Sequence, residues 1–351
     1  MDDIIRQWQD AVVAAQSPLR LCGGDSKSFY GEPSLGELFD TRAYRGVIDY
    51  EPSELVVTAR CGTPLAELEA ALADHGQMLA FEPPHFGAGA TLGGCIATGL
   101  SGPRRASAGA ARDFVLGTTL LDGSGRVLRF GGQVMKNVAG FDVSRLLVGS
   151  LGTLGLIAEV SLKVLPLPGM EVTLQLAMNE CEAHIALARW IGENRPISAS
   201  CWYDGVLSLR LSGATTAIAP ARERIGGEVL ASGEQFWREV REQQHFFFSG
   251  DAPLWRISLP ALAAPLNLPG ATLIEWFGAQ RWVRGSAEIG PDALRARVAA
   301  LGGHATLFRD SLPGVQRFQS LSPALQTVHA RLKAAFDPRG IFNPGRMYAG
   351  L

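Results

Sequence analysis

Two adjacent glycines open a short polar run near the start of the sequence, in "LCGGDSKSFYG", residues 21–31. A glycine turn at a strand end can aim successive backbone N–H groups at one point, and such a nest binds anions. Ser26 and Ser28 add hydroxyl groups and Lys27 adds a positive charge. The run is therefore a candidate phosphate cradle, although a plain surface turn can have the same residues. It has neither the GxxxxGK[ST] spacing of a P-loop nor the GxGxxG of a Rossmann fingerprint.

Two more segments combine glycines with other small residues. Glycine loses more entropy than any other residue when it is ordered. We therefore expect these segments to be stable where a large flat ligand lies against their backbone, and three cradles suit a ligand as long as a dinucleotide. The second segment holds Gly87, Gly89, Gly93, Gly94, Gly99 and Gly102, and the third holds Gly140, Gly149, Gly152 and Gly155.

Local signals place strands and helices around the glycine segments. Residues 53–60, 114–132 and 155–168 indicate strands, and residues 61–77 indicate a helix with Thr63 as its N-cap. Residues 200–213 indicate a hairpin that turns at an Asp-Gly pair. Other expected elements are a helix over 181–194, strands over 253–260 and 271–278, and a final helix from Ser322 to Asp337.

These elements predict an α+β protein with an inserted domain. We expect a ligand-binding domain over residues 1–168, an α+β cap domain with an antiparallel sheet over 169–320, and a C-terminal segment, 321–351, that returns to the first domain.

The overall composition excludes several classes of protein. The chain has 351 residues, 19% of them charged, and a formal net charge of −2, so no large basic field would attract nucleic acid or an anionic membrane. The acidic start lacks the features of a signal peptide, and no uninterrupted apolar run reaches about 18 residues. We expect a cytoplasmic protein that does not insert into a membrane.

Cysteine and histidine spacing argues against a metal. The five cysteines are scattered without a CxxC pair, which is untypical of a disulfide framework, a zinc site or an iron–sulfur cluster. The six histidines never form a pair at ligand spacing. We expect no metal site in this chain.

The order of the glycine segments resembles the flavin-binding domain of the vanillyl-alcohol oxidase/p-cresol methylhydroxylase superfamily. "GATLGGCIATGLSG" is similar to the stretch that lines the flavin there, and "GSLGTLGLIAEV" to the one near the adenine. "FDPRGIFNPGRM" is similar to the end of the FAD-linked oxidase branch. Within that branch, "CGGDSKSFYG" and "KNVAGFDVSRLLVGSLGTLG" look most like the FAD-binding E subunits of bacterial glycolate oxidase. The resemblance covers residues 18–168 and 322–349.

The resemblance implies FAD as the cofactor and assigns residues to its parts. It implies Gly23, Gly24, Asp25, Ser26 and Lys27 around the pyrophosphate; Pro83, Pro84, Thr91, Gly93, Gly94, Ala97, Thr98 and Gly99 along the flavin; and Gly152, Gly155 and Ile157 near the adenine or ribose. Gly102 and Gly140 are further expected cofactor-binding residues. Asn343 and Arg346 would return to the flavin domain from the C-terminus. Lys136, Asn137 and Asp142 either hydrogen-bond the flavin ring or satisfy the backbone of their own loop.

One departure from the family pattern concerns the attachment of FAD. Many relatives bind FAD covalently through a histidine that follows the two glycines of the first loop, and here that position is Asp25. We therefore expect non-covalent FAD. A cysteinyl link through Cys95 is the alternative.

The resemblance also implies partners and chemistry. Catalytic relatives oxidise 2-hydroxy acids with a histidine-rich metal motif, and "GGHATLFRD", residues 302–310, lacks most of it. We therefore expect an FAD-binding subunit that contributes electron transfer and assembly to glycolate oxidation. Its partners would be a related catalytic flavin subunit and an iron–sulfur subunit, and through them it would sit at the inner membrane.

Two other functions stay open. The chain could be a self-sufficient FAD-dependent 2-hydroxy acid dehydrogenase in which Arg256, on a strand, binds the substrate carboxylate; an exposed or core-edge arginine is the plainer interpretation. His245, beside three phenylalanines, is a candidate base or a packing residue. The chain could also be a scaffold whose flavin site is vestigial.

Overall fold

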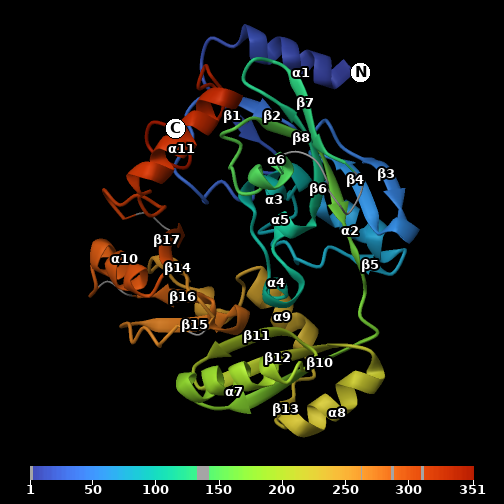
Figure 1. Cartoon of the computed structure of the whole chain (residues 1–351), viewed down its shortest axis with the longest axis vertical. Coiled ribbons are helices and arrows are strands. Elements are labelled where there is room, and N and C mark those ends of the chain that lie inside the picture. The colour runs from blue at the N-terminus through green and yellow to red at the C-terminus, as the bar shows by residue number, and fades with distance from the viewer. Residues whose placement is uncertain (1–2, 133–141, 262, 286–287, 310–311) are drawn as a thin grey trace. The chain divides into compact units, whose positions relative to one another are not determined.

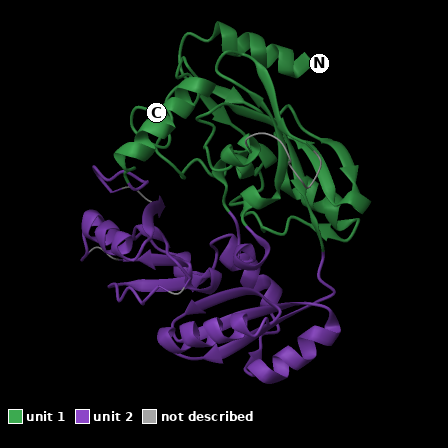
Figure 2. Cartoon of the chain, viewed as in Figure 1, with its two compact units in different colours: residues 1–100, 110–166, 320–351 green, residues 101–109, 167–319 purple. Residues whose placement is uncertain are grey.

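The computed structural model describes residues 3–132, 142–261, 263–285, 288–309 and 312–351 (Figure 1). The chain divides into two compact units (Figure 2). Unit 1 comprises residues 1–100, 110–166 and 320–351, and unit 2 comprises residues 101–109 and 167–319. Each unit mixes helices with antiparallel sheet, which confirms the predicted α+β class.

Unit 1 is built on a five-stranded antiparallel sheet with the order β3-β4-β8-β6-β7. The central strand β8 is buried over almost its whole length, because helices and loops cover both of its faces. These strands are β3 (Val47–Glu51), β4 (Val56–Arg60), β6 (Val115–Leu121), β7 (Val127–Gly131) and β8 (Leu156–Lys163). The smaller strands are β1 (Leu19–Cys22) and β2 (Glu37–Asp40), which pair in parallel, and β5 (Gln77–Met78) and β9 (Leu165–Pro166).

The helices of unit 1 follow the apolar patterns of the sequence. α1 buries Ile5, Trp8 and Val12 in a core that also contains Phe39 and Phe342. This places the two ends of the chain in one core. The helices are α1 (Asp3–Ala14), α2 (Leu65–Ala73), α3 (Leu92–Thr98), α5 (Ala111–Phe114), α6 (Val143–Leu146) and α11 (Pro323–Phe336).

The C-terminal segment is tied to unit 1 by hydrogen bonds as well as by apolar contact. Lys333 Nζ donates to the backbone oxygens of Thr153 and Phe342 and to Asp337 Oδ2, each at 2.7 Å. Leu19 N donates to Ile341 O at 2.7 Å. These bonds hold the end of the chain beside β1, the strand that leads into the candidate cradle.

Unit 2 has an eight-stranded antiparallel sheet with the order β13-β10-β12-β11-β15-β16-β14-β17. The predicted hairpin forms between β11 and β12, and its two turn residues, Asp204 and Gly205, have positive φ angles of 47° and 77°, as the favoured two-residue turn requires. The strands are β10 (Met170–Ala177), β11 (Ile197–Tyr203), β12 (Val206–Gly213), β13 (Glu228–Val229), β14 (Leu254–Ser258), β15 (Ala271–Glu275), β16 (Gln280–Arg284) and β17 (His304–Arg309). The helices are α4 (Arg105–Ala108), α7 (Glu180–Gly192), α8 (Thr215–Ile225), α9 (Gly233–Arg241) and α10 (Pro291–Ala300).

Residues 101–109 lie in unit 2, whereas the sequence places them with the flavin domain. Their contacts give the reason. Trp276 Nε1 donates to Gly102 O at 3.0 Å, Ser107 Oγ donates to Ser198 O at 2.8 Å, and the Arg105 guanidinium lies 4.3 Å from the Trp276 ring centre. Gly102 therefore belongs to a different unit from the other glycines of its segment.

Two predicted helix starts have different outcomes. Ser322 caps α11 by accepting a hydrogen bond from Leu325 N, as predicted. Thr63 does not cap α2, because its hydroxyl donates to Arg60 O at 2.7 Å and the helix begins two residues later. In the described part of the chain, no helix is both long and apolar enough to span a bilayer.

Candidate functional site

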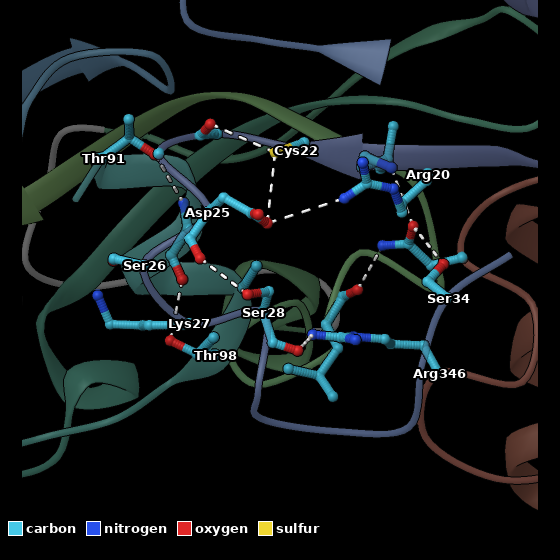
Figure 3. A pocket seen from close by; sticks show the side chains of 17 residues that line it. Arg20, Cys22, Asp25, Ser26, Lys27, Ser28, Ser34, Thr91, Thr98 and Arg346 are labelled. Atoms are coloured by element: carbon cyan, nitrogen blue, oxygen red, sulfur yellow. Dashed lines mark hydrogen bonds and ion pairs between the residues drawn. The ribbon is translucent and has the colours of Figure 1, made fainter. Parts of the chain in front are cut away.

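A cavity of about 110 Å³ lies at the end of β1 in unit 1 (Figure 3). Four segments far apart in the sequence form its wall, and all of them belong to unit 1. Its lining residues are Arg20, Leu21, Cys22, Gly23, Gly24, Asp25, Ser26, Lys27, Ser28, Ser34, Thr91, Gly94, Ala97, Thr98, Leu151, Asn343 and Arg346.

The turn after β1 is shaped by Asp25, which has a positive φ of 57°. Aspartate tolerates this left-handed conformation better than most residues. The backbone oxygen of Asp25 accepts hydrogen bonds from Ser28 N at 3.2 Å and from Ser28 Oγ at 3.0 Å. These bonds close the turn, so that residues 23–28 run along the cavity wall.

The two glycines of this turn are required by contact with the second glycine segment. A Cβ atom on Gly24 would lie 1.4 Å from Gly89 O, and one on Gly23 would lie 2.3 Å from Thr91 Oγ1. Real Cβ atoms essentially never approach other atoms so closely. The first segment therefore packs directly, backbone on backbone, against the second.

Other glycines of the predicted cradles also pack within unit 1. A Cβ on Gly93 would lie 2.8 Å from Cys61 Cβ, and one on Gly155 would lie 2.8 Å from Leu121 O. Gly99 has a positive φ of 62° and ends α3. Packing inside the unit is thus a reason for glycine at these positions besides contact with a ligand, and their role toward the cofactor stays a prediction.

The second segment faces the cavity with one side of the short helix α3. Thr91 caps this helix by accepting a hydrogen bond from Gly94 N at 3.3 Å. Thr98 Oγ1 bonds back to Gly94 O at 2.9 Å. Gly94 and Ala97 lie between these two threonines and have no bulky side chain that would fill the cavity.

The C-terminal segment supplies another part of the wall. Asn343 is 4% exposed; its Oδ1 accepts from Leu21 N at 2.9 Å and its Nδ2 donates to Leu151 O at 2.7 Å. Arg346 donates to the backbone oxygens of residues 28, 30 and 32 at 2.6–2.8 Å. The two side chains fix the edges of the cavity, which agrees with the predicted return of this segment.

The charged residues of the cavity are three cations and one carboxylate: Arg20, Lys27, Arg346 and Asp25. Lys27 is 7% exposed and its Nζ donates to His85 O at 3.2 Å. Arg20 Nη1 lies 3.8 Å from Asp25 Oδ1. With the hydroxyl groups of Ser26, Ser28, Ser34, Thr91 and Thr98, this set of side chains fits an anion.

Ten of the sequence-predicted cofactor residues line the cavity: Gly23, Gly24, Asp25, Ser26, Lys27, Thr91, Gly94, Ala97, Thr98 and Asn343. Eight other described ones in unit 1 do not line it: Pro83, Pro84, Gly93, Gly99, Asp142, Gly152, Gly155 and Ile157. Lys136, Asn137 and Gly140 lie outside the described residues. Asp142 is exposed, caps α6 and pairs with Arg145 Nε at 2.9 Å. These contacts favour the alternative in which Asp142 satisfies the backbone of its own loop.

The sequence-based site omits several residues of the cavity. Arg20 and Cys22 are separated by two positions on β1, so strand alternation places them on one face. This spacing is the sequence signal from which Arg20 could have been assigned to the cavity. No local signal indicates Ser34 or Leu151, because both reach the cavity only through the fold.

The burial of Cys95 argues against a covalent flavin link through this residue. Cys95 is 1% exposed, and burial raises the pKa of its thiol to about 12. A thiolate is the reactive form of cysteine. Cys95 is therefore unsuited to attack a flavin.

In unit 2, Arg256 lies on the sheet face opposite to Trp255 and Ile257, which are 3% and 0% exposed. Its Nε donates to Gln280 Oε1 at 2.7 Å, and its guanidinium lies 5.3 Å from the Trp276 ring centre. Gln280 in turn donates to Glu275 at 3.0 Å. Arg256 is thus held in one orientation by its neighbours on the sheet.

The other catalytic candidates of unit 2 are less suitable. His245 is 8% exposed, contacts the rings of Tyr203, Phe236 and Phe246, and accepts a hydrogen bond from Phe247 N. These contacts support its interpretation as a packing residue. Among the described residues, no group of three or more His, Cys, Asp or Glu side chains could hold a metal ion.

Comparison with known proteins relates the chain to an FAD-binding family and to glycolate oxidase subunits. A family model described as "FAD binding domain" matches residues 2–131. The chain is 50% identical over 339 residues to glycolate oxidase subunit GlcE of Escherichia coli, covering 97% of this chain and 95% of that protein. It is 32% identical over 169 residues to glycolate oxidase subunit GlcD of Bacillus subtilis, covering 48% of this chain and 34% of that protein.

Solved structures with the same fold include two of alkyldihydroxyacetonephosphate synthase. The first superposes with a TM-score of 0.67 at 17% identity and covers 97% of this chain and 74% of the synthase chain. The second has the same TM-score at 15% identity. Identities this low relate the folds alone.

Proposed function

The chain belongs to the family of glycolate oxidase subunit GlcE, and on that premise we propose that it is the FAD-binding subunit of a multi-subunit glycolate oxidase. It is an FAD-dependent oxidoreductase subunit. The relationship extends over nearly the full length of both proteins, so it includes the cap unit as well as the flavin unit. In this function the chain contributes flavin electron transfer and assembly to the oxidation of glycolate to glyoxylate.

The cavity at the end of β1 is the observation that carries this proposal. Its three cations, hydroxyl groups and small residues suit the diphosphate of FAD. Its volume of about 110 Å³ is below the several hundred Å³ of sites that enclose whole ligands. The cavity would therefore hold one polar part of the cofactor and not the whole of it.

Bound FAD would supply a hydride and electron acceptor, and the residues of this chain would hold it. Ser26, Ser28 and the positive charge of the cavity would favour the diphosphate, while Gly94 and Ala97 leave room beside α3. Position 25, where the family resemblance implies a histidine for covalent attachment, is an aspartate, and Cys95 is buried. We therefore assign a dissociable flavin.

The partners of the complex follow from the relatives. GlcD is by its name another subunit of glycolate oxidase, and part of its sequence matches this chain. The partner of this chain would be a related flavin subunit that carries the acid-oxidation chemistry. An iron–sulfur subunit would pass electrons on, and the assembly would lie at the inner membrane through its partners.

The first test is the visible spectrum of the purified chain before and after acid precipitation, followed by anaerobic glycolate. A yellow protein that releases its flavin into the acid supernatant, and that glycolate bleaches only after the catalytic subunit is added, is expected. A protein that is colourless and cannot be reloaded with FAD would overturn the proposal in favour of a scaffold with a vestigial site.

A second candidate function is a self-sufficient FAD-dependent 2-hydroxy acid dehydrogenase. The observation that favours it is the fixed orientation of Arg256, because a held guanidinium is suited to bind a carboxylate. Bleaching of the isolated chain by glycolate, lost in R256Q and partly retained in R256K, would establish it. An unchanged rate in R256Q would exclude this role for Arg256.

A further inference from the structure

We propose that Arg20 is the cation that recognises the diphosphate, and that Asp25 holds its guanidinium in place until the ligand replaces the carboxylate. This inference rests on the proposed function, because it deepens the same cavity. It concerns two side chains that the structure brings together at the end of β1, Arg20 in the strand and Asp25 in the turn that follows.

The position of Arg20 is the first argument. Its guanidinium points along the cavity toward Asp25, as Figure 3 shows. The Arg20 side chain is 35% exposed and the Asp25 side chain 57% exposed, with 3.8 Å between Nη1 and Oδ1. Within the described residues, this ion pair is the polar contact that the structure gives the guanidinium. The distance exceeds that of a hydrogen bond, so a ligand could replace the contact at little cost.

The other two cations of the cavity differ from Arg20 in what they contact. Lys27 is nearly buried, and its ammonium group, which donates to His85 O, extends away from the Arg20–Asp25 pair (Figure 3). Arg346 donates to three backbone oxygens of the loop that follows the turn. Both side chains therefore stabilise the wall, whereas Arg20 is poised to meet a ligand.

The presence of a carboxylate in an anion site is the second argument. Asp25 would repel a diphosphate if it stood alone in the cavity. Paired with Arg20, it keeps the guanidinium over the turn and prevents it from extending into solvent. The incoming diphosphate offers two charged groups with several acceptor oxygens, and arginine binds such groups through two N–H donors at once. It would therefore displace the single, weakly held carboxylate.

Binding of three ligands to the apoprotein tests this exchange. FAD contains the diphosphate and the flavin, ADP contains the diphosphate without the flavin, and riboflavin contains the flavin without phosphate. Calorimetry with wild type, R20Q, R20K and D25N would give the dissociation constants. Asparagine also tolerates the left-handed conformation of residue 25, so D25N leaves the turn intact.

The two substitutions are expected to act in opposite directions. R20Q should weaken FAD and ADP by about tenfold or more, as for the loss of a charge-assisted hydrogen bond, and leave riboflavin unchanged. R20K should lose less affinity for FAD and ADP than R20Q does, because lysine keeps the positive charge. D25N should tighten FAD and ADP by about fivefold at low salt, and this gain should shrink in high salt and in the R20Q/D25N double variant.

The results separate this inference from the function on which it rests. A wild-type apoprotein that binds neither FAD nor ADP would overturn the proposed function. Wild-type FAD binding with unchanged ADP affinity in R20Q would overturn the role of Arg20 alone. Weaker ADP binding in D25N would overturn the exchange, because Asp25 would then assist the ligand.

Discussion

The two units of this chain present their charged groups in different ways. In unit 1 the segments of the cavity wall are brought together by glycines at close approach and by buried polar side chains from the C-terminus. In unit 2, Arg256 stands on a regular strand and is oriented by side chains of the neighbouring strands. The first arrangement depends on backbone atoms in close contact, and the second depends on side chains that can be substituted without moving the backbone.

This difference predicts how the units respond to substitution. A methyl group added in unit 1 meets backbone, which cannot change rotamer, so the fold itself must yield. A side chain lost from the sheet face of unit 2 leaves the strand ladder intact. Damage to cofactor binding in unit 1 should therefore coincide with loss of stability, whereas in unit 2 the two effects should separate.

The largest effect is expected for G24A. The new Cβ would lie 1.4 Å from Gly89 O, and relief of this clash requires the two glycine segments to separate. We expect a loss of about 3 kcal/mol or more in the free energy of unfolding of unit 1, as for severe overpacking, together with loss of FAD binding. Urea denaturation followed by circular dichroism measures the first effect.

G132A is the matched control, because a Cβ at Gly132 meets no atom within 4 Å. It should unfold as wild type does. Equal stability of G24A and G132A would contradict the backbone-to-backbone contact on which the comparison depends.

K333M should have the next largest effect. Lys333 Nζ bonds Asp337, whose side chain is 0% exposed, and two backbone oxygens. Removing the ammonium group leaves a buried carboxylate without its cation, which costs about 3 kcal/mol. Because the C-terminal segment also forms the cavity wall, FAD affinity should fall with stability; K163M, on β8, is the comparison variant. A stable K333M with normal FAD affinity would show that the segment is held by apolar contacts.

The smallest expected effect is a dependence of the stability of unit 2 on pH. Burial lowers the pKa of His245 below its ordinary value of 6.5, so the unfolded chain takes up a proton at a higher pH than the folded unit does. Unit 2 should therefore lose stability as the pH falls below about 6.5, with no effect above it. H245Q should reduce the dependence of stability on pH without abolishing it, because His184 and His304, whose pKa values burial also lowers, remain in the variant. Tryptophan fluorescence during denaturation at several pH values measures it; equal slopes would assign the dependence to the other histidines.

The local elements of both units could be predicted from the sequence. The hairpin at Asp204–Gly205 and the start of α11 at Ser322 were predicted correctly, because both depend on residues next to each other in the chain. Thr63 was predicted wrongly as a cap, because a distant contact competed: its hydroxyl also accepts a hydrogen bond from Gly46 N. Residues 101–109 were assigned to the flavin domain because their glycine pattern continues, whereas Trp276 and Ser198 hold them in unit 2.

The sequence by itself determined the fold class, the family resemblance and the turn at which the cavity forms, since short motifs and local periodicity carry all three. Only the tertiary structure decided which glycines face the cavity and which pack against the chain, because a φ angle or a short contact depends on partners far away in the sequence. The role that we propose for Arg20 beside Lys27 also rests on the tertiary structure. Both are basic residues beside the same turn, and only their contacts distinguish them.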